Sequence, residues 1–305
     1  MNFSSAEKIA KAVLYEGYIL YPYRPSSTKN QQRWNFGTLY PRAWAETQKP
    51  AEPFRMITEC VVAAGPESRI HLQPRFLQFL PSVEGWEQGV ERWADQSELN
   101  VASLCDEVHS FDLFFKQTSQ VATLKPLMGS LSIAAAALPD GFYKLHLELS
   151  NATPTSGGFS RTEMLLQSMI SAHLLMGIED GEFVSLLDPP EMAADAVRSC
   201  QNVGAFPVLV GDESQRTMML SSPIILYDYP QIAPESTGDF FDGTEMDEML
   251  ALRVMTLTDA EKDAMRQGDE QARMILERTD NLPAEHWMKV HGAIRGMRRV
   301  PEEEL

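Results

Sequence analysis

One segment near the middle of the chain constrains the fold more than any other. Residues 142–149 alternate between two sets of side chains, which is the pattern of a β-strand with one face in a core. Phe142, Lys144, His146 and Glu148 lie on one side, and Tyr143, Leu145, Leu147 and Leu149 lie on the other. The preceding Pro139-Asp140-Gly141 is typical of a turn, because Asp and Gly tolerate positive φ. The sequence therefore predicts a β-hairpin that joins residues 131–138 to this strand.

Further strand-like segments fill the first half of the chain. Residues 54–63, 69–80 and 111–115 are rich in β-branched, aromatic and other apolar side chains. Residues 86–104 are ambiguous, since their tryptophans suit a helix and their later apolar residues suit a strand. A short helix is expected at the start, where Ser4-Ser5-Ala6-Glu7 has the form of a capping box.

The second half of the chain has a different pattern. Residues 151–158 (NATPTSGG) show no apolar period, so we expect a linker there. Residues 161–177 carry apolar side chains at helical spacing and end on a glycine, which predicts a helix. Short strands are expected at residues 207–210 and 222–229, and helices from Asp247 onward.

These patterns predict an α+β fold in two parts. The first is a β-rich, sandwich-like domain over residues 1–150 that contains the opening helix and an aromatic loop. A linker at residues 151–158 then leads to a mixed α/β domain over residues 159–305 that ends in helices. At 305 residues the chain is long enough for two such units.

The composition is that of an ordinary globular protein, with 44% hydrophobic and 23% charged residues. No run approaches the roughly 18 apolar residues of a membrane-spanning helix, so membrane insertion is not expected. The first residues lack the basic and apolar regions of a secretory signal, which predicts a cytoplasmic protein. Cys60, Cys105 and Cys200 are isolated, which indicates buried, reduced thiols rather than a disulfide framework or a zinc site.

Charge is distributed unevenly along the chain, whose net charge is -17. Residues 1–50 hold seven Lys and Arg against three Asp and Glu, whereas residues 162–260 hold three Arg against seventeen Asp and Glu. Such an acidic segment repels the phosphates of nucleic acids. The charge pattern therefore disfavours DNA or RNA as a ligand and favours a basic protein partner.

The sequence contains no complete catalytic motif. Its six histidines do not form H-E-x-x-H, and it has neither G-x-S-x-G nor a phosphate-binding loop. We therefore predict no catalytic residue, no metal ligand and no cofactor. An alternative is a metal-handling or hydrolytic enzyme whose site is assembled from dispersed residues, such as His71, Glu163, His173 and Asp242.

Two segments have the composition of protein-binding surfaces. Five of the eight tyrosines lie within residues 15–40, and residues 239–242 place two phenylalanines between two aspartates. Tyr, Trp and Arg often anchor interfaces, and carboxylates beside apolar rings suit a basic, apolar partner. The predicted partner-binding residues are Tyr15, Tyr18, Tyr21, Tyr23, Arg24, Arg33, Trp34, Phe36, Asp239, Phe240, Phe241 and Asp242. Equally, the rings of the first segment could cover a seam between the two halves, and the second could be a solvated loop before a helix.

Several blocks of the sequence resemble a known family. They are VLYEGYILYPYR, KNQQRWNFGTLYP, GEFVSLLDPP, LSSPIILYDYPQIAPES and GDFFDGTEMDEMLALRVMTLTDAEK. The family consists of bacterial proteins encoded among the structural and accessory genes of nickel-iron uptake hydrogenases, notably the actinobacterial-type enzymes. The resemblance implies an accessory or assembly protein that binds a hydrogenase subunit or maturation intermediate in the cytoplasm. A permanent structural subunit of the hydrogenase complex is the alternative within the same context.

Overall fold

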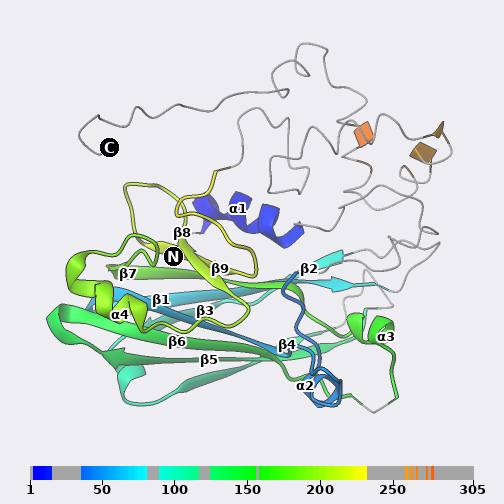
Figure 1. Ribbon diagram of the computed structural model, residues 1–305, viewed down its shortest axis with the longest axis horizontal. Helices are drawn as coiled ribbons and strands as arrows, with labels where there is room; N and C mark the ends of the chain where they lie inside the picture. Colours follow the sequence, from blue (N-terminus) through cyan, green and yellow to red (C-terminus); the bar gives the residue numbers. More distant parts are fainter. Residues whose placement is uncertain are drawn as a thin grey trace, which may run out of the picture.

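A computed structural model describes residues 3–15, 36–80, 89–116, 124–155 and 158–231, together with residues 258, 259, 262, 263, 266, 273, 276 and 277. The described part is dominated by one antiparallel sheet with a few short helices, which confirms the β-rich α+β class (Figure 1). The helices expected from Asp247 onward fall almost entirely outside the described residues.

Nine strands form the sheet, in the order β4-β5-β6-β1-β7-β9-β8, with β2 and β3 also paired to β1. Their bounds are β1 (Arg55–Phe79), β2 (Gly89–Trp93), β3 (Gln96–Asn100), β4 (His109–Phe115), β5 (Leu127–Ala137), β6 (Phe142–Asn151), β7 (Ile170–Phe183), β8 (Phe206–Leu209) and β9 (Met218–Ser222). The helices are α1 (Ser4–Tyr15), α2 (Arg42–Ala45), α3 (Arg161–Leu165) and α4 (Ala194–Arg198), with single 3-10 turns at Ser103–Cys105, Pro139–Gly141 and Glu191–Ala193. None of these helices combines the length and hydropathy that crossing a lipid bilayer requires.

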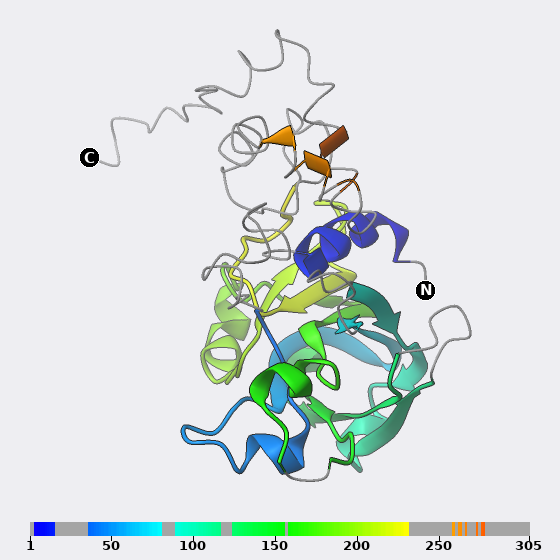
Figure 2. The same cartoon turned by 90° about the vertical axis from the view of Figure 1, so that its right-hand side faces the viewer.

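Strand β1 is the central strand of the sheet, because β6, β3, β2 and β7 all pair with parts of its 25 residues. Its first part pairs with β6 through residues 55–63, and its later part pairs with β3 and β2 through residues 69–79. Strand β7 follows the opposite edge of β1 from Val62 to Leu77. The register shifts between Ala64 and Arg69, and the sheet is strongly curled (Figure 2).

The predicted alternation in residues 142–149 is confirmed. Leu145, Leu147 and Leu149 of β6 are buried in the main core together with apolar residues of β1, β4, β5 and β7. Burying a leucine contributes roughly 2 kcal/mol, so these positions fix the orientation of the strand. The turn before β6 also has the expected geometry, with φ of 60° at Asp140 and 77° at Gly141.

Helix α1 confirms the prediction of an N-terminal helix. Its Ala6, Ala10 and Val13 are buried against Leu175 of β7 and Leu220 of β9, so the helix covers one face of the β7-β9-β8 part of the sheet (Figure 1). Helices α2 and α3 lie near each other at one end of the sheet, and α4 lies at the other end (Figure 1).

The helix predicted for residues 161–177 is wrong beyond its first turn. Helix α3 ends at Leu165, and residues from Ile170 onward form β7, with Gly177 opposite His71 of β1 rather than at a helix end. Residues 170–178 are buried without interruption, because the sheet core lies on one face and α1 with further residues on the other. A strand buried on both faces has a continuous apolar run, which periodicity cannot distinguish from a buried helix.

Residues 151–158, expected to be a linker, join two parts of one sheet. Asn151 is buried at the end of β6, where its Nδ2 donates to the carbonyl oxygens of Leu39 and Gln167, each at 2.9 Å. Strands β6 and β7, from either side of this segment, are both hydrogen-bonded to β1. The described parts of the two predicted domains therefore share one sheet and one core.

Smaller differences concern local elements. The ambiguous residues 86–104 contain β2 and β3, and residues 223–229 form no regular strand. Cys60 is buried as expected, and burial raises the pKa of its thiol, whereas Cys105 is exposed. The expectation of buried thiols is therefore wrong at Cys105.

Candidate functional site

Of the predicted partner-binding residues, the structure describes Tyr15 and Phe36. Tyr15 is only 2% exposed, packs with Leu77 and Phe79, and donates a hydrogen bond from its hydroxyl to Glu91 Oε1 at 2.8 Å. This environment is that of a core residue. At this position it favours the interpretation that the tyrosine ring covers a seam within the protein rather than binding a partner. Phe36 is exposed. The other predicted partner-binding residues lie outside the described residues. They are Tyr18, Tyr21, Tyr23, Arg24, Arg33, Trp34, Asp239, Phe240, Phe241 and Asp242.

The dispersed residues of the alternative enzyme site do not converge where they are described. Glu163 is at the start of α3, where its carboxylate accepts hydrogen bonds from the backbone and hydroxyl of Ser160. His71 and His173 share a face of the sheet but lie four register positions apart, about 13 Å at the usual rise per residue. Within the described ranges, no group of three or more His, Cys, Asp or Glu side chains is placed to hold a metal ion. Asp242 lies outside those ranges.

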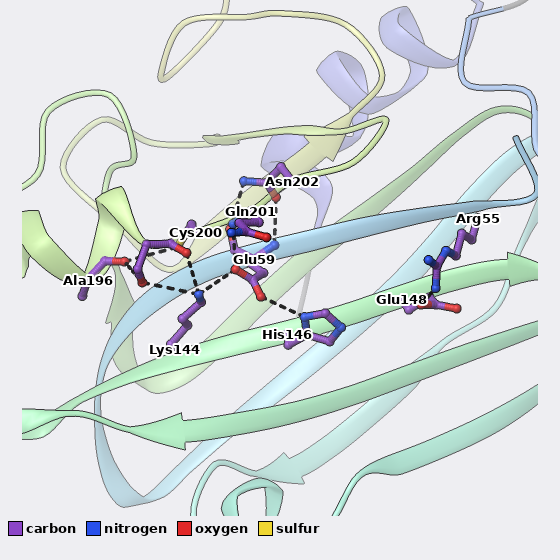
Figure 3. Close-up of polar contacts among 10 residues, drawn as sticks. Arg55, Glu59, Lys144, His146, Glu148, Ala196, Cys200, Gln201 and Asn202 are labelled. Atoms are coloured by element: carbon purple, nitrogen blue, oxygen red, sulfur yellow. Dashed lines mark hydrogen bonds and ion pairs between the residues drawn. The ribbon is translucent and has the colours of Figure 1, made fainter.

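A polar network is present on the open face of the first part of the sheet (Figure 3). Glu59 of β1 is its centre. The Oε2 atom lies 2.6 Å from Lys144 Nζ and accepts a hydrogen bond from the Gln201 backbone N–H at 2.7 Å. The Oε1 atom lies 3.0 Å from His146 Nδ1. The Glu59 backbone also pairs with Asn202, whose Oδ1 accepts from its N–H at 2.8 Å and whose Nδ2 donates to its C=O at 3.3 Å.

Strand pairing explains why these side chains meet. His146 is directly opposite Glu59, and Lys144 is directly opposite Val61, so all three polar groups project from the same face. Alternation in the sequence predicts the polar side of β6 but does not predict the role of Glu59. Opposite charges on two predicted neighbouring strands are the signal that could have indicated this pairing.

The Glu59 carboxylate is held in its charged form. Burial by itself would raise its pKa, but the hydrogen bonds with Lys144, His146 and Gln201 outweigh burial, and the pKa is lowered. Near this network, burial raises the pKa of the Cys200 thiol despite the opposing charge of Lys144. A carboxylate whose pKa is lowered by three hydrogen-bond partners and a thiol whose pKa is raised by burial are poorly suited to base or nucleophile chemistry.

The network instead attaches a loop to the sheet. Lys144 Nζ also donates to the Ser199 carbonyl oxygen at 2.8 Å, at the end of α4. Beyond Asn202, Val203 exchanges two backbone hydrogen bonds of 3.0 Å with Ile57 of β1. The segment that leads into β8 is thereby fixed over the open face.

The segments before and after the β8-β9 hairpin carry exposed apolar side chains. Val203 and Phe206 precede and begin β8, and Ile225 and Tyr227 follow β9 with 76% and 86% of their surfaces exposed. We call Val203, Phe206, Ile225 and Tyr227 the hairpin surface, because they flank the β8-β9 hairpin.

The residues after β9 alternate between core and solvent. Ile224 and Leu226 pack against the core beneath α1, whereas Ile225 and Tyr227 face outward. The segment is then anchored to β8: Tyr229 N–H donates to the Leu209 carbonyl oxygen at 2.7 Å, and Asp228 Oδ1 accepts from Leu209 N–H at 2.8 Å. The exposed side chains are therefore held by a fixed backbone.

The surroundings of the hairpin surface are acidic in sequence. Residues 179–229 contain nine Asp and Glu against two Arg. Large apolar side chains amid carboxylates are the composition of an interface core with a charged rim. This arrangement can bind a basic, apolar protein segment.

No model of a known protein family matches this chain, and a search of curated protein sequences finds no significant match.

Proposed function

We propose that this protein is a non-catalytic accessory protein that binds a protein partner through the hairpin surface. The carrying observation is the exposure of Ile225 and Tyr227 on a backbone that is anchored at both ends. An exposed isoleucine and tyrosine side by side gain free energy when a partner covers them, and a fixed backbone reduces the entropy that binding costs.

The Glu59 network supports the same function. It holds Val203 beside β1 through Lys144, Gln201 and Asn202, so one half of the hairpin surface is positioned before a partner arrives. Long-range attraction between the acidic segment and a basic partner would speed association.

The choice of partner depends on the sequence resemblance to the hydrogenase-associated family, which implies a hydrogenase protein. On that basis we propose a subunit or maturation intermediate of a nickel-iron hydrogenase, bound during assembly. Phe36, which is exposed, and the predicted binding residues that lie outside the described ranges remain predicted contacts for the same partner.

The test is co-expression of the tagged full chain with the precursor and mature forms of the hydrogenase large subunit, followed by affinity capture. We expect capture of the precursor, and at least tenfold weaker capture by the double variant Ile225→Ser, Tyr227→Ser. The matched control is Val108→Ser, Phe114→Ser, which removes two exposed apolar side chains, one just before β4 and one within it. All three proteins should melt within about 1 °C of one another, because surface substitutions rarely change stability.

The outcomes separate the parts of the proposal. Undiminished capture by the hairpin variant would refute the hairpin surface as the binding site. Failure of the native chain to bind any form of the hydrogenase would refute the choice of partner. Equal capture of the mature enzyme would indicate a permanent subunit rather than an assembly factor.

A further inference from the structure

Arg75 occupies an unusual position for an arginine. It lies in the later part of β1 and is 9% exposed, and its Nη1 atom is buried without a hydrogen-bond partner in the described part of the chain. Arg75 forms an ion pair with Glu91, whose Oε2 lies 4.0 Å from Nη2, and this distance is too long for a hydrogen bond. Glu91 Oε1 already accepts from the Tyr15 hydroxyl. A buried cation that is paired so weakly is costly to retain.

His173 of β7 is directly opposite Arg75 and is fully buried. Its Nδ1 donates to the Ser171 carbonyl oxygen at 2.9 Å, so the neutral ring presents Nε2 as a lone-pair acceptor. That Nε2 atom has no hydrogen-bond partner among the described residues. An unpaired donor and an unpaired acceptor therefore lie on neighbouring strands.

Trp93 of β2 completes a row across three strands. It is directly opposite Arg75 on the other edge of β1, and it is 52% exposed. Directly opposite residues of antiparallel strands project from the same face with Cβ atoms about 5 Å apart. The row Trp93, Arg75 and His173 is thus buried at its β7 end and open to solvent at its β2 end.

We propose that Arg75 and His173 bind a small organic acid that carries a hydroxyl beside its carboxylate, with Trp93 forming the outer wall. The carboxylate accepts from Arg75 Nη1, and the hydroxyl donates to His173 Nε2. One ligand of this class satisfies both buried atoms. An apolar or aromatic substituent on the acid would extend toward the indole ring of Trp93, where it gains contact area.

A contribution to folding stability does not explain why Arg75 Nη1 and His173 Nε2 are buried without hydrogen-bond partners among the described residues. Most buried polar groups in folded proteins have a hydrogen-bond partner, so a buried donor and a buried acceptor that both lack one, directly opposite each other, call for an explanation, and a bound ligand supplies it. The end of α1 is attached near this row. Ser171 Oγ, two residues before His173, donates to the Val13 carbonyl oxygen, and the Tyr15 hydroxyl donates to Glu91 Oε1. Ligand binding would therefore also be sensed by the end of α1.

The test measures the melting temperature of the full chain at pH 7 with mandelate, with phenylacetate, which lacks the hydroxyl, and with mandelamide, which lacks the charge. We expect mandelate at tenfold excess over its Kd to raise the melting temperature by about 3 °C. Phenylacetate should give a smaller shift and mandelamide none.

Three variants assign the effect to named atoms. Arg75→Met should abolish the mandelate shift and, by removing an uncompensated charge, leave the ligand-free melting temperature equal or higher. His173→Asn keeps a donor for Ser171 but loses the acceptor, so mandelate should then act no better than phenylacetate. The control Arg55→Met removes an exposed arginine from the open face and should keep the full response.

Three outcomes would contradict the proposed ligand site. A mandelate shift that persists in Arg75→Met would place binding elsewhere, and the absence of any shift in the native chain would overturn the proposed ligand class. A ligand-free melting temperature several degrees lower in Arg75→Met would identify Arg75 as structural support and refute the proposal.

Discussion

Glu59 and Arg75 lie on the same strand and project from the same face of the sheet, yet they have opposite surroundings. Glu59 is on the part of the face that remains open, and its carboxylate is paired with Lys144, His146 and a backbone N–H. Arg75 is on the part beside α1, and its Nη1 atom and the Nε2 atom of its neighbour His173 both lack a hydrogen-bond partner among the described residues. A well-paired charge at the edge of solvent is a structural attachment, whereas a buried charge whose one described ion pair is 4.0 Å long reduces stability and indicates a binding site.

The comparison also shows how one strand can serve two purposes. Along one edge, the strand paired with β1 changes from β6 to β3 and then β2. Helix α1 packs against β7 and the later part of β1, and not against its first part. The same alternation in β1 therefore leads to a solvent-facing network in one half and a buried row in the other.

The largest predicted effect concerns the acid sensitivity of the buried row. Burial lowers the pKa of His173 from 6.5 to about 4, aided by the charge of Arg75. Between these values the unfolded chain binds a proton that the folded chain excludes, so stability falls as the pH decreases from about 6.5 to 4. The loss attributable to His173 is about 3 kcal/mol. Urea unfolding of the native chain and of His173→Asn across this range should show the difference, and parallel pH profiles would contradict it.

The next largest effect is expected at the paired network. Glu59→Gln removes the charge that Lys144, His146 and the Gln201 N–H share, and should lower the free energy of unfolding by about 2 kcal/mol at pH 7. The Gln201 amide should exchange with solvent faster, because its acceptor is weakened. Urea unfolding and hydrogen exchange measure the two changes. An unchanged Gln201 exchange rate would show that the loop is held by other contacts.

A smaller effect is expected where α1 meets the buried row. Ser171→Ala removes the 3.0 Å hydrogen bond to the Val13 carbonyl oxygen and should cost about 1 kcal/mol. Alanine shares the penalty of the positive φ of 51° at this position, so backbone strain does not change between the two proteins. Urea unfolding gives the cost, and faster exchange of α1 amides would locate it. A neutral substitution would mean that apolar contacts alone hold α1.

The smallest effect is expected for a pair on the open face itself. Arg55 Nη1 lies 2.8 Å from Glu148 Oε2, and both side chains are partly exposed. Arg55→Ala should therefore change the free energy of unfolding by less than about 0.5 kcal/mol. A loss comparable to that of Glu59→Gln would show that the open face is one coupled network, which a double variant of Arg55 and Glu59 could measure.

Part of this architecture could be predicted from local patterns. The alternation in residues 142–149, the turn at Asp140 and Gly141, and the helix that begins at Ser4 all depend on residues close in sequence, and all three are confirmed. Secondary structure in the second half of the chain could not be predicted as reliably from local patterns. Residues 170–178 are apolar on both faces, so their pattern carried no information on strand or helix.

The candidate sites could not be predicted in the same way. Glu59 meets His146 across 87 residues of sequence, and Arg75 meets His173 only because β7 pairs with β1. Such contacts depend on register, and a shift of one residue would turn each side chain to the other face. The predicted binding residue Tyr15 was assigned to an interface by its type, and only packing against Leu77 and Phe79 shows that it belongs to a core.

The sequence by itself determined the β-rich class, the inward and outward sides of β6, the start of α1 and the acidic character of the second half. The reason is that dihedral preferences, capping and charge act over a few residues. Only the tertiary structure decided that one sheet spans both halves, that Glu59 is paired, and that Arg75 and His173 are buried side by side. Those outcomes depend on which distant strands become neighbours, and the free energy that selects them comes from burial over the whole core.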